Sequence, residues 1–244
     1  MIKLNCDLGE TDVLHPEGPE HQVMPYIHMA NIACGFHAGN RSTILATLRL
    51  AKQHQVMVGA HPSYPDRENF GRLSMELSQA DVSDTVFQQL SLMEALCEQE
   101  DIPLSYVKPH GALYHDLLYQ ESTRHGIFQA VADLSTPLPV LILAHVNQDA
   151  IEASAKRYGI TLWYEAFADR RYHQDGRLQS RTENGAVLKD AQSIIAQAKA
   201  IAKGEPITTV EDTSLIIKAH SLCVHGDNPA AVTTVKAIRK ALSQ

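Results

Sequence analysis

Seven short apolar runs recur along the chain, and each is too short to form a typical helix. They are rich in β-branched, aromatic and small apolar residues, as expected for strands that are covered on both faces of a parallel sheet. The runs occupy residues 2–6, 30–34, 56–60, 105–108, 139–144, 162–167 and 221–224. We therefore predict a strand at each of these seven positions.

Longer stretches with apolar residues at helical spacing separate these runs. Residues 41–54 follow Asn40, a good N-cap residue, and place Ile44 and Leu48 on one face. Further helices are predicted at residues 79–100, 147–158, 190–203 and 229–242. The last of these begins with Pro229, which suits a first helical turn.

Strands that alternate with helices imply right-handed βα units. Seven such units within 244 residues predict an α/β fold, a closed (β/α) barrel with about seven parallel strands. An open doubly wound sheet is the alternative. The composition does not change along the chain and no linker is visible, so we expect residues 1–244 to form a single domain.

Composition narrows the class of protein. The chain has 21 Lys and Arg against 28 Asp and Glu, a net charge of −7, which argues against nucleic acid or an anionic membrane as the main partner. No apolar run approaches the roughly 18 residues of a membrane span, and the N-terminus has no secretory h-region. The four cysteines lack metal-site spacing, so we expect reduced thiols and a cytoplasmic location.

Polar residues collect where the predicted strands end. Six of the seven runs lead into a charged or imidazole group, mostly beside glycine or proline. In chain order these groups are Asp7 and Glu10, His37, His61, Lys108 and His110, Asp169 and Arg170, and His225 and Asp227. The carboxyl ends of parallel strands share one face in a barrel and one edge in an open sheet, so either fold predicts one common pocket.

The residue types in this pocket permit two kinds of chemistry. A carboxylate with two or more imidazoles could bind a divalent metal, with Asp7, His37 and His61 as candidate ligands. The same groups could instead act as general acid and base without a metal. Lys108 is either a solvated lysine or a ligand for a carboxylate or phosphate. The chain has no H-E-x-x-H motif, nucleophile elbow or P-loop, so spacing does not decide between these interpretations.

Several long motifs resemble those of one known family. LNCDLGE, ANIACGFHAG, GAHPSYPD, VKPHGALY, EAFADRRY and CVHGD are similar to motifs of the LamB/YcsF family, which comprises the A component of bacterial 5-oxoprolinase. The resemblance runs from Ile2 to about Ala237. It implies a seven-stranded barrel akin to glycoside hydrolase/deacetylase barrels, and ATP-dependent hydrolysis of 5-oxo-L-proline to L-glutamate together with the B and C subunits.

The resemblance also suggests roles for the residues that fall within the matching motifs. As catalytic residues we consider Asp7, Glu10, His37, His61 and His110. As substrate-binding residues we consider Lys108, Asp169, Arg170, His225 and Asp227. Two other functions stay open: a stand-alone metal-dependent amide hydrolase or deacetylase, and a non-catalytic subunit that binds the lactam for its partners.

Overall fold

Seven parallel strands close into a barrel in the computed structural model, which describes residues 2–11, 15, 18–145, 148–224 and 229–242. The barrel strands are β1 (Lys3–Leu8), β2 (Met29–Ala33), β3 (Met57–His61), β4 (Leu104–Val107), β5 (Val140–Leu143), β6 (Leu162–Phe167) and β9 (Ser221–Cys223). Neighbours follow chain order, and β9 closes the ring by pairing with both β1 and β6. The predicted barrel is confirmed and the open sheet is wrong. Every predicted strand agrees with an observed one to within two residues at each end.

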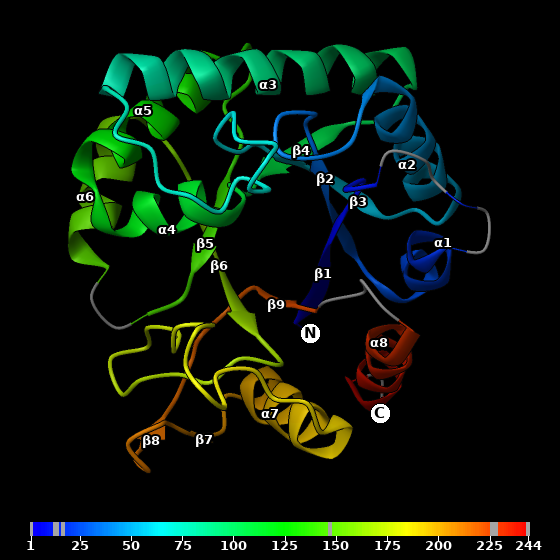
Figure 1. The fold of residues 1–244 in the computed structure, drawn as a ribbon, viewed down its shortest axis with the longest axis vertical. Helices are drawn as coiled ribbons and strands as arrows, with labels where there is room; N and C mark the ends of the chain where they lie inside the picture. Colours follow the sequence, from blue (N-terminus) through cyan, green and yellow to red (C-terminus); the bar gives the residue numbers. More distant parts are fainter. Residues whose placement is uncertain (1, 12–14, 16–17, 146–147, 225–228, 243–244) are drawn as a thin grey trace.

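Helices surround the strands, with α3 along one side of the view in Figure 1 and α7 near the opposite side. The helices are α1 (Pro19–Val23), α2 (Arg41–Gln53), α3 (Gln79–Gln99), α4 (Gly111–Tyr119), α5 (Glu121–Ala132), α6 (Asp149–Arg157), α7 (Ala191–Lys203) and α8 (Pro229–Leu242), with a 3₁₀ turn η1 (Met24–Tyr26). The five predicted helices correspond to α2, α3, α6, α7 and α8. Asn40 caps α2 as expected, because its side chain accepts hydrogen bonds from the backbone N–H groups of Ser42 and Thr43.

Some elements of the fold were not predicted from the sequence. Two helices, α4 and α5, occupy residues 111–132, for which no element was expected, and α1 and η1 were also missed. The same holds for a small antiparallel pair formed by β7 (Ile207–Thr208) and β8 (Ser214–Leu215). Between β6 and α7 the chain makes a long irregular excursion, and Arg171 ties it to the β7–β8 pair by donating to the Thr209 carbonyl at 2.9 Å.

The interior of the barrel is filled rather than open. The main hydrophobic core lies between the sheet and the helices. A separate cluster of Met29, Tyr106 and Leu141 sits inside the barrel, with Met57 and Trp163 packed against it. These residues close the barrel near the N-terminal ends of its strands. The polar groups lie on the opposite side, at the carboxyl ends of the strands.

Gly59 makes room for part of this plug. A Cβ atom at Gly59 would lie 2.2 Å from the Tyr106 ring, so the ring can cross the barrel only because β3 has no side chain there. The Tyr106 hydroxyl then donates to Asn31 Oδ1 at 2.5 Å. Glycine at this position is therefore required by packing and not by its backbone angles.

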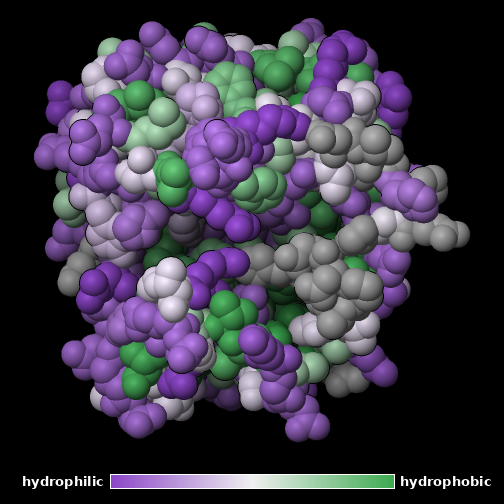
Figure 2. All heavy atoms as spheres, viewed as in Figure 1, coloured by the Kyte–Doolittle hydropathy of each residue, from purple (hydrophilic) through white to green (hydrophobic). Residues whose placement is uncertain are grey.

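The surface seen in Figure 2 is mainly hydrophilic, with hydrophobic residues scattered among hydrophilic ones. No helix within the described ranges is both long enough and apolar enough to cross a membrane.

Candidate functional site

The carboxyl ends of four adjacent strands bring six of the predicted site residues together. Their order along the chain is Asp7 and Glu10 from β1 and its loop, His37 after β2, His61 at the end of β3, and Lys108 and His110 after β4. The first two loops touch closely. A Cβ atom at Gly39 would lie 2.4 Å from the Gly9 carbonyl oxygen, and both glycines have positive φ angles, +73° and +72°. These glycines allow the loops that carry Glu10 and His37 to meet.

Lys108 lies at the centre of a buried polar network. Its Nζ is 2.9 Å from Asp7 Oδ1 and 3.2 Å from Glu165 Oε2. It also contacts Asn5 Oδ1 at 3.3 Å and Cys223 Sγ at 3.4 Å. With three N–H groups and four acceptors around it, the ammonium is fully engaged. Lys108 is therefore neither solvated nor free to bind an anionic substrate group.

Electrostatics hold this network in its charged form. Burial alone would lower the pKa of Lys108, but the carboxylates of Asp7 and Glu165 hold it well above its usual value. Burial would likewise raise the pKa of Asp7, but Lys108 and His61 hold it well below its usual range. The second Asp7 oxygen, Oδ2, faces His61 Nε2 at 3.5 Å and links the network to the histidines.

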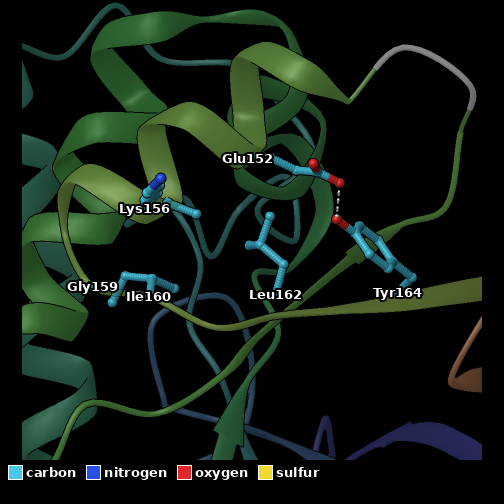
Figure 3. Close-up of a pocket in the computed structure, with 7 residues that line it drawn as sticks. Glu152, Lys156, Gly159, Ile160, Leu162 and Tyr164 are labelled. Carbon is cyan, nitrogen blue, oxygen red and sulfur yellow. Dashed lines mark hydrogen bonds between the residues drawn. The ribbon is translucent and has the colours of Figure 1, made fainter.

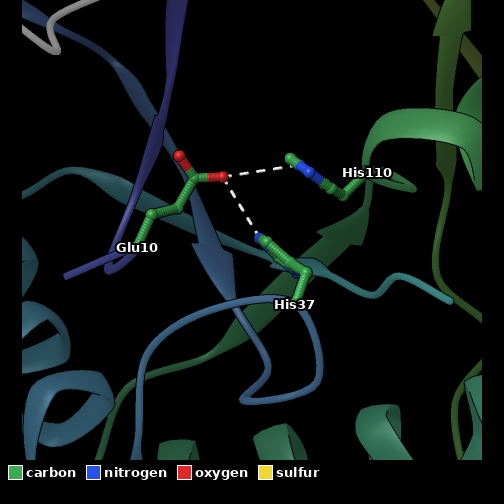
Figure 4. A group of neighbouring side chains, drawn as sticks. All are labelled: Glu10, His37 and His110. Atoms are coloured by element: carbon green, nitrogen blue, oxygen red, sulfur yellow. Dashed lines mark hydrogen bonds and ion pairs between the residues drawn. The ribbon is translucent and has the colours of Figure 1, made fainter. Parts of the chain in front are cut away.

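Glu10 and two parallel imidazoles form the second part of the site (Figure 4). Glu10 Oε1 lies 3.1 Å from His37 Nε2 and 3.4 Å from His110 Nδ1. The rings of His37 and His110 stack with centroids 3.8 Å apart and planes 7° apart. The side chains of Asp7 and Glu10 remain 24% exposed, so they are the carboxylates that a molecule entering from solvent can reach.

Backbone carbonyls fix the orientation of His61 and His110. His61 Nδ1 lies 2.7 Å from the Lys108 carbonyl oxygen, and His110 Nε2 lies 2.9 Å from that of Phe70. Since a carbonyl oxygen only accepts, these outer nitrogens must carry hydrogen. The inner nitrogens, His61 Nε2 and His110 Nδ1, then face each other at 3.0 Å, and neither carries hydrogen when both rings are neutral.

Burial shapes the acid–base properties of this group. It lowers the pKa of His37 to about 3 and that of His110 to about 3, with further lowering from His61. Burial and the charge of Asp7 raise the pKa of Glu10. The site thus contains one carboxylate with a depressed pKa and one with a raised pKa, the arrangement that separates acid and base roles.

Three of these residues also form a possible metal-binding group. Glu10, His37 and His110 each offer one ligand atom, and the three atoms lie within 4.8 Å of one another. Of the three ligands suggested by the sequence, only His37 belongs to this group. Asp7 instead accepts a hydrogen bond from Asn31 at 2.6 Å and pairs with Lys108. Two imidazoles and a carboxylate are a donor set that suits Zn²⁺ and similar ions.

The remaining predicted residues are not part of this cluster or are not described. Asp169 and Arg170 lie on the excursion after β6. Arg170 is buried and donates to the Gln179 carbonyl at 2.6 Å. His225 and Asp227 lie outside the described residues.

Sequence reasoning missed several buried polar residues inside the barrel. Asn5, Asn31, Glu165 and Ser221 are all fully buried. Asn5 Nδ2 donates to Glu165 Oε2 at 3.1 Å and to Ser221 Oγ at 3.0 Å. A signal was present, because a polar residue in the middle of an apolar parallel strand has to face other polar groups.

A surface pocket elsewhere does not belong to this site. It has a volume of about 410 Å³ and lies between α6 and the outer face of β6, where Glu152 and Lys156 line it together with Leu162 and Tyr164 (Figure 3). The Tyr164 hydroxyl donates to Glu152 at 2.7 Å across it. Leu162 and Tyr164 alternate along β6 with Glu165, which faces the barrel interior, so this pocket opens on the outside of the barrel.

Residues 2–244 match the sequence profile of the LamB/YcsF family. The chain belongs to the LamB/YcsF family. It is 45% identical to a protein of Chromohalobacter salexigens that is named as the A subunit of 5-oxoprolinase, over 98% of this chain and 95% of the relative. It is 43% identical to a protein of the same name from Pseudomonas fluorescens, over 100% of this chain and 97% of the relative.

A solved structure has the same fold. The lactam utilization protein of Thermus thermophilus is 34% identical to this chain and superposes with a TM-score of 0.91. The match covers 100% of this chain and 96% of the other.

Proposed function

We propose that the protein is the A subunit of a 5-oxoprolinase. With the B and C subunits it would convert 5-oxo-L-proline to L-glutamate in a reaction coupled to ATP hydrolysis. The observation that carries this proposal is the full-length similarity to relatives that bear this name, at 45% identity in the Chromohalobacter salexigens protein. The carboxylate–imidazole cluster at the mouth of the barrel supplies the chemistry that such a protein needs.

ATP has a physical reason to participate. Amide resonance makes the five-membered lactam a poor electrophile at neutral pH. Transfer of the γ-phosphoryl group to the lactam oxygen would replace a poor electrophile with a better one. Water can then add to the activated ring carbon, and the ring nitrogen leaves as an amine once it gains a proton. The acyl phosphate that remains is hydrolysed by a second water, which releases inorganic phosphate and L-glutamate.

The cluster provides both proton transfers. Glu10 is 24% exposed and has a raised pKa, which suits it to take a proton from the attacking water. A proton held between His61 Nε2, His110 Nδ1 and Asp7 Oδ2 is available for the departing nitrogen. Lys108 keeps Asp7 ionised and in place, so it acts as a positioning residue.

A divalent metal is compatible with the same groups. Glu10, His37 and His110 would hold it, and the inner nitrogen of His110 is available because its outer nitrogen donates to the Phe70 carbonyl. A metal there would polarise the lactam carbonyl. This donor set also favours a second candidate function, that of a metal-dependent amide hydrolase acting without ATP.

We place the protein in the cytoplasm, because all four cysteines are buried free thiols, as expected in a reducing compartment.

Turnover assays test the proposal. The chain would be mixed with the B and C subunits, and glutamate formation from 5-oxo-L-proline would be measured with and without ATP. We expect activity only with ATP, and a loss of about 10²–10⁴-fold in His61→Ala and Asp7→Asn, the range for proton-transfer residues. His115→Ala is the control, because that side chain is 69% exposed on α4.

Two outcomes would redirect the proposal. Activity without ATP that a chelator abolishes would support the metal-dependent hydrolase. Near-normal glutamate formation in both site variants, with folding intact, would mean that this chain binds the lactam without carrying out the chemistry.

A further inference from the structure

The loop of residues 66–72 packs directly against the histidines of the candidate site. His110 Nε2 donates to the Phe70 carbonyl at 2.9 Å. A Cβ atom at Gly71 would lie 3.1 Å from the His37 Cβ atom and 3.1 Å from the His110 Cδ2 atom, so only glycine lets the loop come this close. The loop therefore forms one side of the site.

Backbone hydrogen bonds hold this loop in an uncommon conformation. Phe70 and Gly71 have φ angles of +57° and +63°, a region that residues other than glycine rarely adopt. The Gly71 N–H donates to the Asp66 carbonyl at 2.7 Å, and the Gly71 carbonyl accepts from the Ala112 N–H at 2.9 Å. The next residue, Arg72, is thus placed at a defined position beside the histidines.

The side chain of Arg72 is exposed and is able to bind a ligand. Its guanidinium carbon lies 4.9 Å from the centre of the Phe70 ring. That ring meets His37 and His110 edge-to-face, with centroids 5.3 Å and 5.1 Å away. The contact with Phe70 leaves the guanidinium without a hydrogen-bond or ion-pair partner among the residues that the structure describes. Its planar fork of N–H groups matches the two oxygens of a carboxylate.

Arg72 is one of two arginines whose charge acts on His37. Burial is the largest cause that lowers the pKa of His37 to about 3, and the charges of Arg67 and Arg72 lower it further. Arg67 is already engaged, because its guanidinium donates to the carbonyls of Gly35 at 3.2 Å and Gly39 at 2.9 Å. It therefore helps to hold the loop after β2, whereas Arg72 is available to a ligand.

The inner part of the site has no positive charge to spare for an anion. Lys108 faces two carboxylates, those of Asp7 and Glu165. Burial lowers the pKa of His37 and of His110 to about 3, so these rings are neutral at pH 7. An anionic group of a substrate is therefore expected to face away from these carboxylates and toward the rim.

The proposed substrate has one anionic group and one reactive group. In 5-oxo-L-proline, the carboxylate and the lactam carbonyl are on the two ring carbons that flank the nitrogen. We propose that Arg72 binds the carboxylate of the substrate, so that the lactam carbonyl carbon is turned toward Glu10 and His61. This inference rests on the proposed function and deepens it, because it names the residue that selects an acidic lactam over a neutral one and orients the ring.

The same orientation has a consequence for the product. L-glutamate keeps the carboxylate that Arg72 would bind, but it has a second carboxylate where the lactam carbonyl was. This new charge would face the carboxylates of Asp7 and Glu165. The product is therefore expected to bind more weakly than the substrate.

A neutral analogue tests the inference. Binding to the full-length chain, alone and with the B and C subunits, would be measured by isothermal titration calorimetry with a chelator present, so that no metal supplies positive charge. The probes are 5-oxo-L-proline and 5-oxo-L-prolinamide, which has a similar shape but no negative charge. We expect the wild-type protein to bind the acid at least about tenfold more tightly than the amide, as for the loss of a charge-assisted pair.

Variants then assign this preference to Arg72. Arg72→Gln should remove most of it by weakening the acid and hardly changing the amide, and in turnover it should raise KM with little effect on kcat. Arg72→Lys keeps the charge without the fork and should fall between the two. Arg157→Gln is the matched control, because Arg157 is also exposed and lies 5.8 Å from the centre of the Tyr158 ring, at the end of α6. It should leave both affinities unchanged.

The outcomes separate this inference from the proposed function. Wild-type protein that binds or turns over 5-oxo-L-proline without preferring it to the amide would overturn the inference alone, and so would an unchanged preference in Arg72→Gln. Inorganic phosphate is the further probe: if Arg72→Gln weakens phosphate but not 5-oxo-L-proline, Arg72 serves a phosphate group and the inference is wrong. Wild-type protein that neither binds nor turns over 5-oxo-L-proline with its partners would overturn the proposed function, and the inference with it.

Discussion

His61 Nε2 and His110 Nδ1 lie 3.0 Å apart, and the opposite nitrogen of each ring faces a backbone carbonyl oxygen. Two nitrogens without hydrogen would repel each other at that distance, so a proton or a metal cation must lie between or beside them. We predict that in the metal-free protein one hydrogen lies between these two nitrogens. Nitrogen-15 NMR of the histidine rings in the presence of a chelator should show both outer nitrogens protonated and one proton on the inner pair. Two unprotonated inner nitrogens would contradict this prediction.

Acid should destabilise the fold through the same histidines. The pKa of His37 and that of His110 are about 3 in the folded state, against 6.5 for an ordinary histidine. Between these values the unfolded chain binds more protons, so stability is full above pH 6.5 and falls as the pH drops. From pH 8 to pH 5 the loss is about 2 kcal/mol for each ring. The raised pKa of Glu10 acts in the opposite direction and offsets part of it.

Urea denaturation at pH 8 and pH 5, with a chelator present, measures this effect. His37→Gln removes one of the two rings and should reduce the difference between the two pH values. A wild-type free energy of unfolding that is the same at both would show that these rings do not titrate as described.

Removing the buried ammonium should cost more than removing a surface one. Lys108→Met leaves the carboxylates of Asp7 and Glu165 without their shared cation, and breaking a buried ion pair costs about 3–5 kcal/mol. Lys52→Met is the matched control, because Lys52 is 51% exposed and its pair with Asp101 spans 3.5 Å, so its loss should cost at most about 1 kcal/mol. Chemical denaturation of both variants checks the difference. Equal losses would mean that Lys108 is not the centre of the network.

A methyl group at Gly59 should disrupt the packing of the Tyr106 ring inside the barrel. Gly59→Ala places a Cβ atom 2.2 Å from the Tyr106 ring, so we expect a loss of about 3 kcal/mol or more, at the upper end of overpacking costs. In a Tyr106→Ala background the same change should cost little, because the ring is gone. Thermal or urea unfolding of the two single variants and the double variant measures this coupling. Additive losses would show that the contact is not what requires glycine.

The barrel could be predicted from the sequence because its strands are buried on both faces. Continuous apolar runs such as residues 139–144 can hardly be placed elsewhere, and chain order then fixes their neighbours. No element is predicted in the region of α4 and α5, although Leu113 and Leu117, and Ile127 and Val131, keep helical spacing. The polar motif at His110 directly precedes this region and obscures the helical spacing that follows it.

The site was predicted in part for a related reason. Polar residues at or after the end of a strand, such as His37 and His61, can be recognised from the sequence because they stand beside predicted turns. Glu165 lies within a strand and interrupts an apolar run, although its carboxylate is one of the two that Lys108 contacts. The pairing of Lys108 with Asp7 joins residues that are 101 positions apart, and only the closed barrel brings them together.

The plug formed by Met29, Tyr106 and Leu141 closes the barrel at the N-terminal ends of its strands, so the described residues leave the candidate site open toward their carboxyl ends. A substrate of the proposed reaction would arrive and depart on that side, and the product would have to leave before the next substrate enters. Product release would then be coupled directly to substrate capture, and a protein that covers that side would control both.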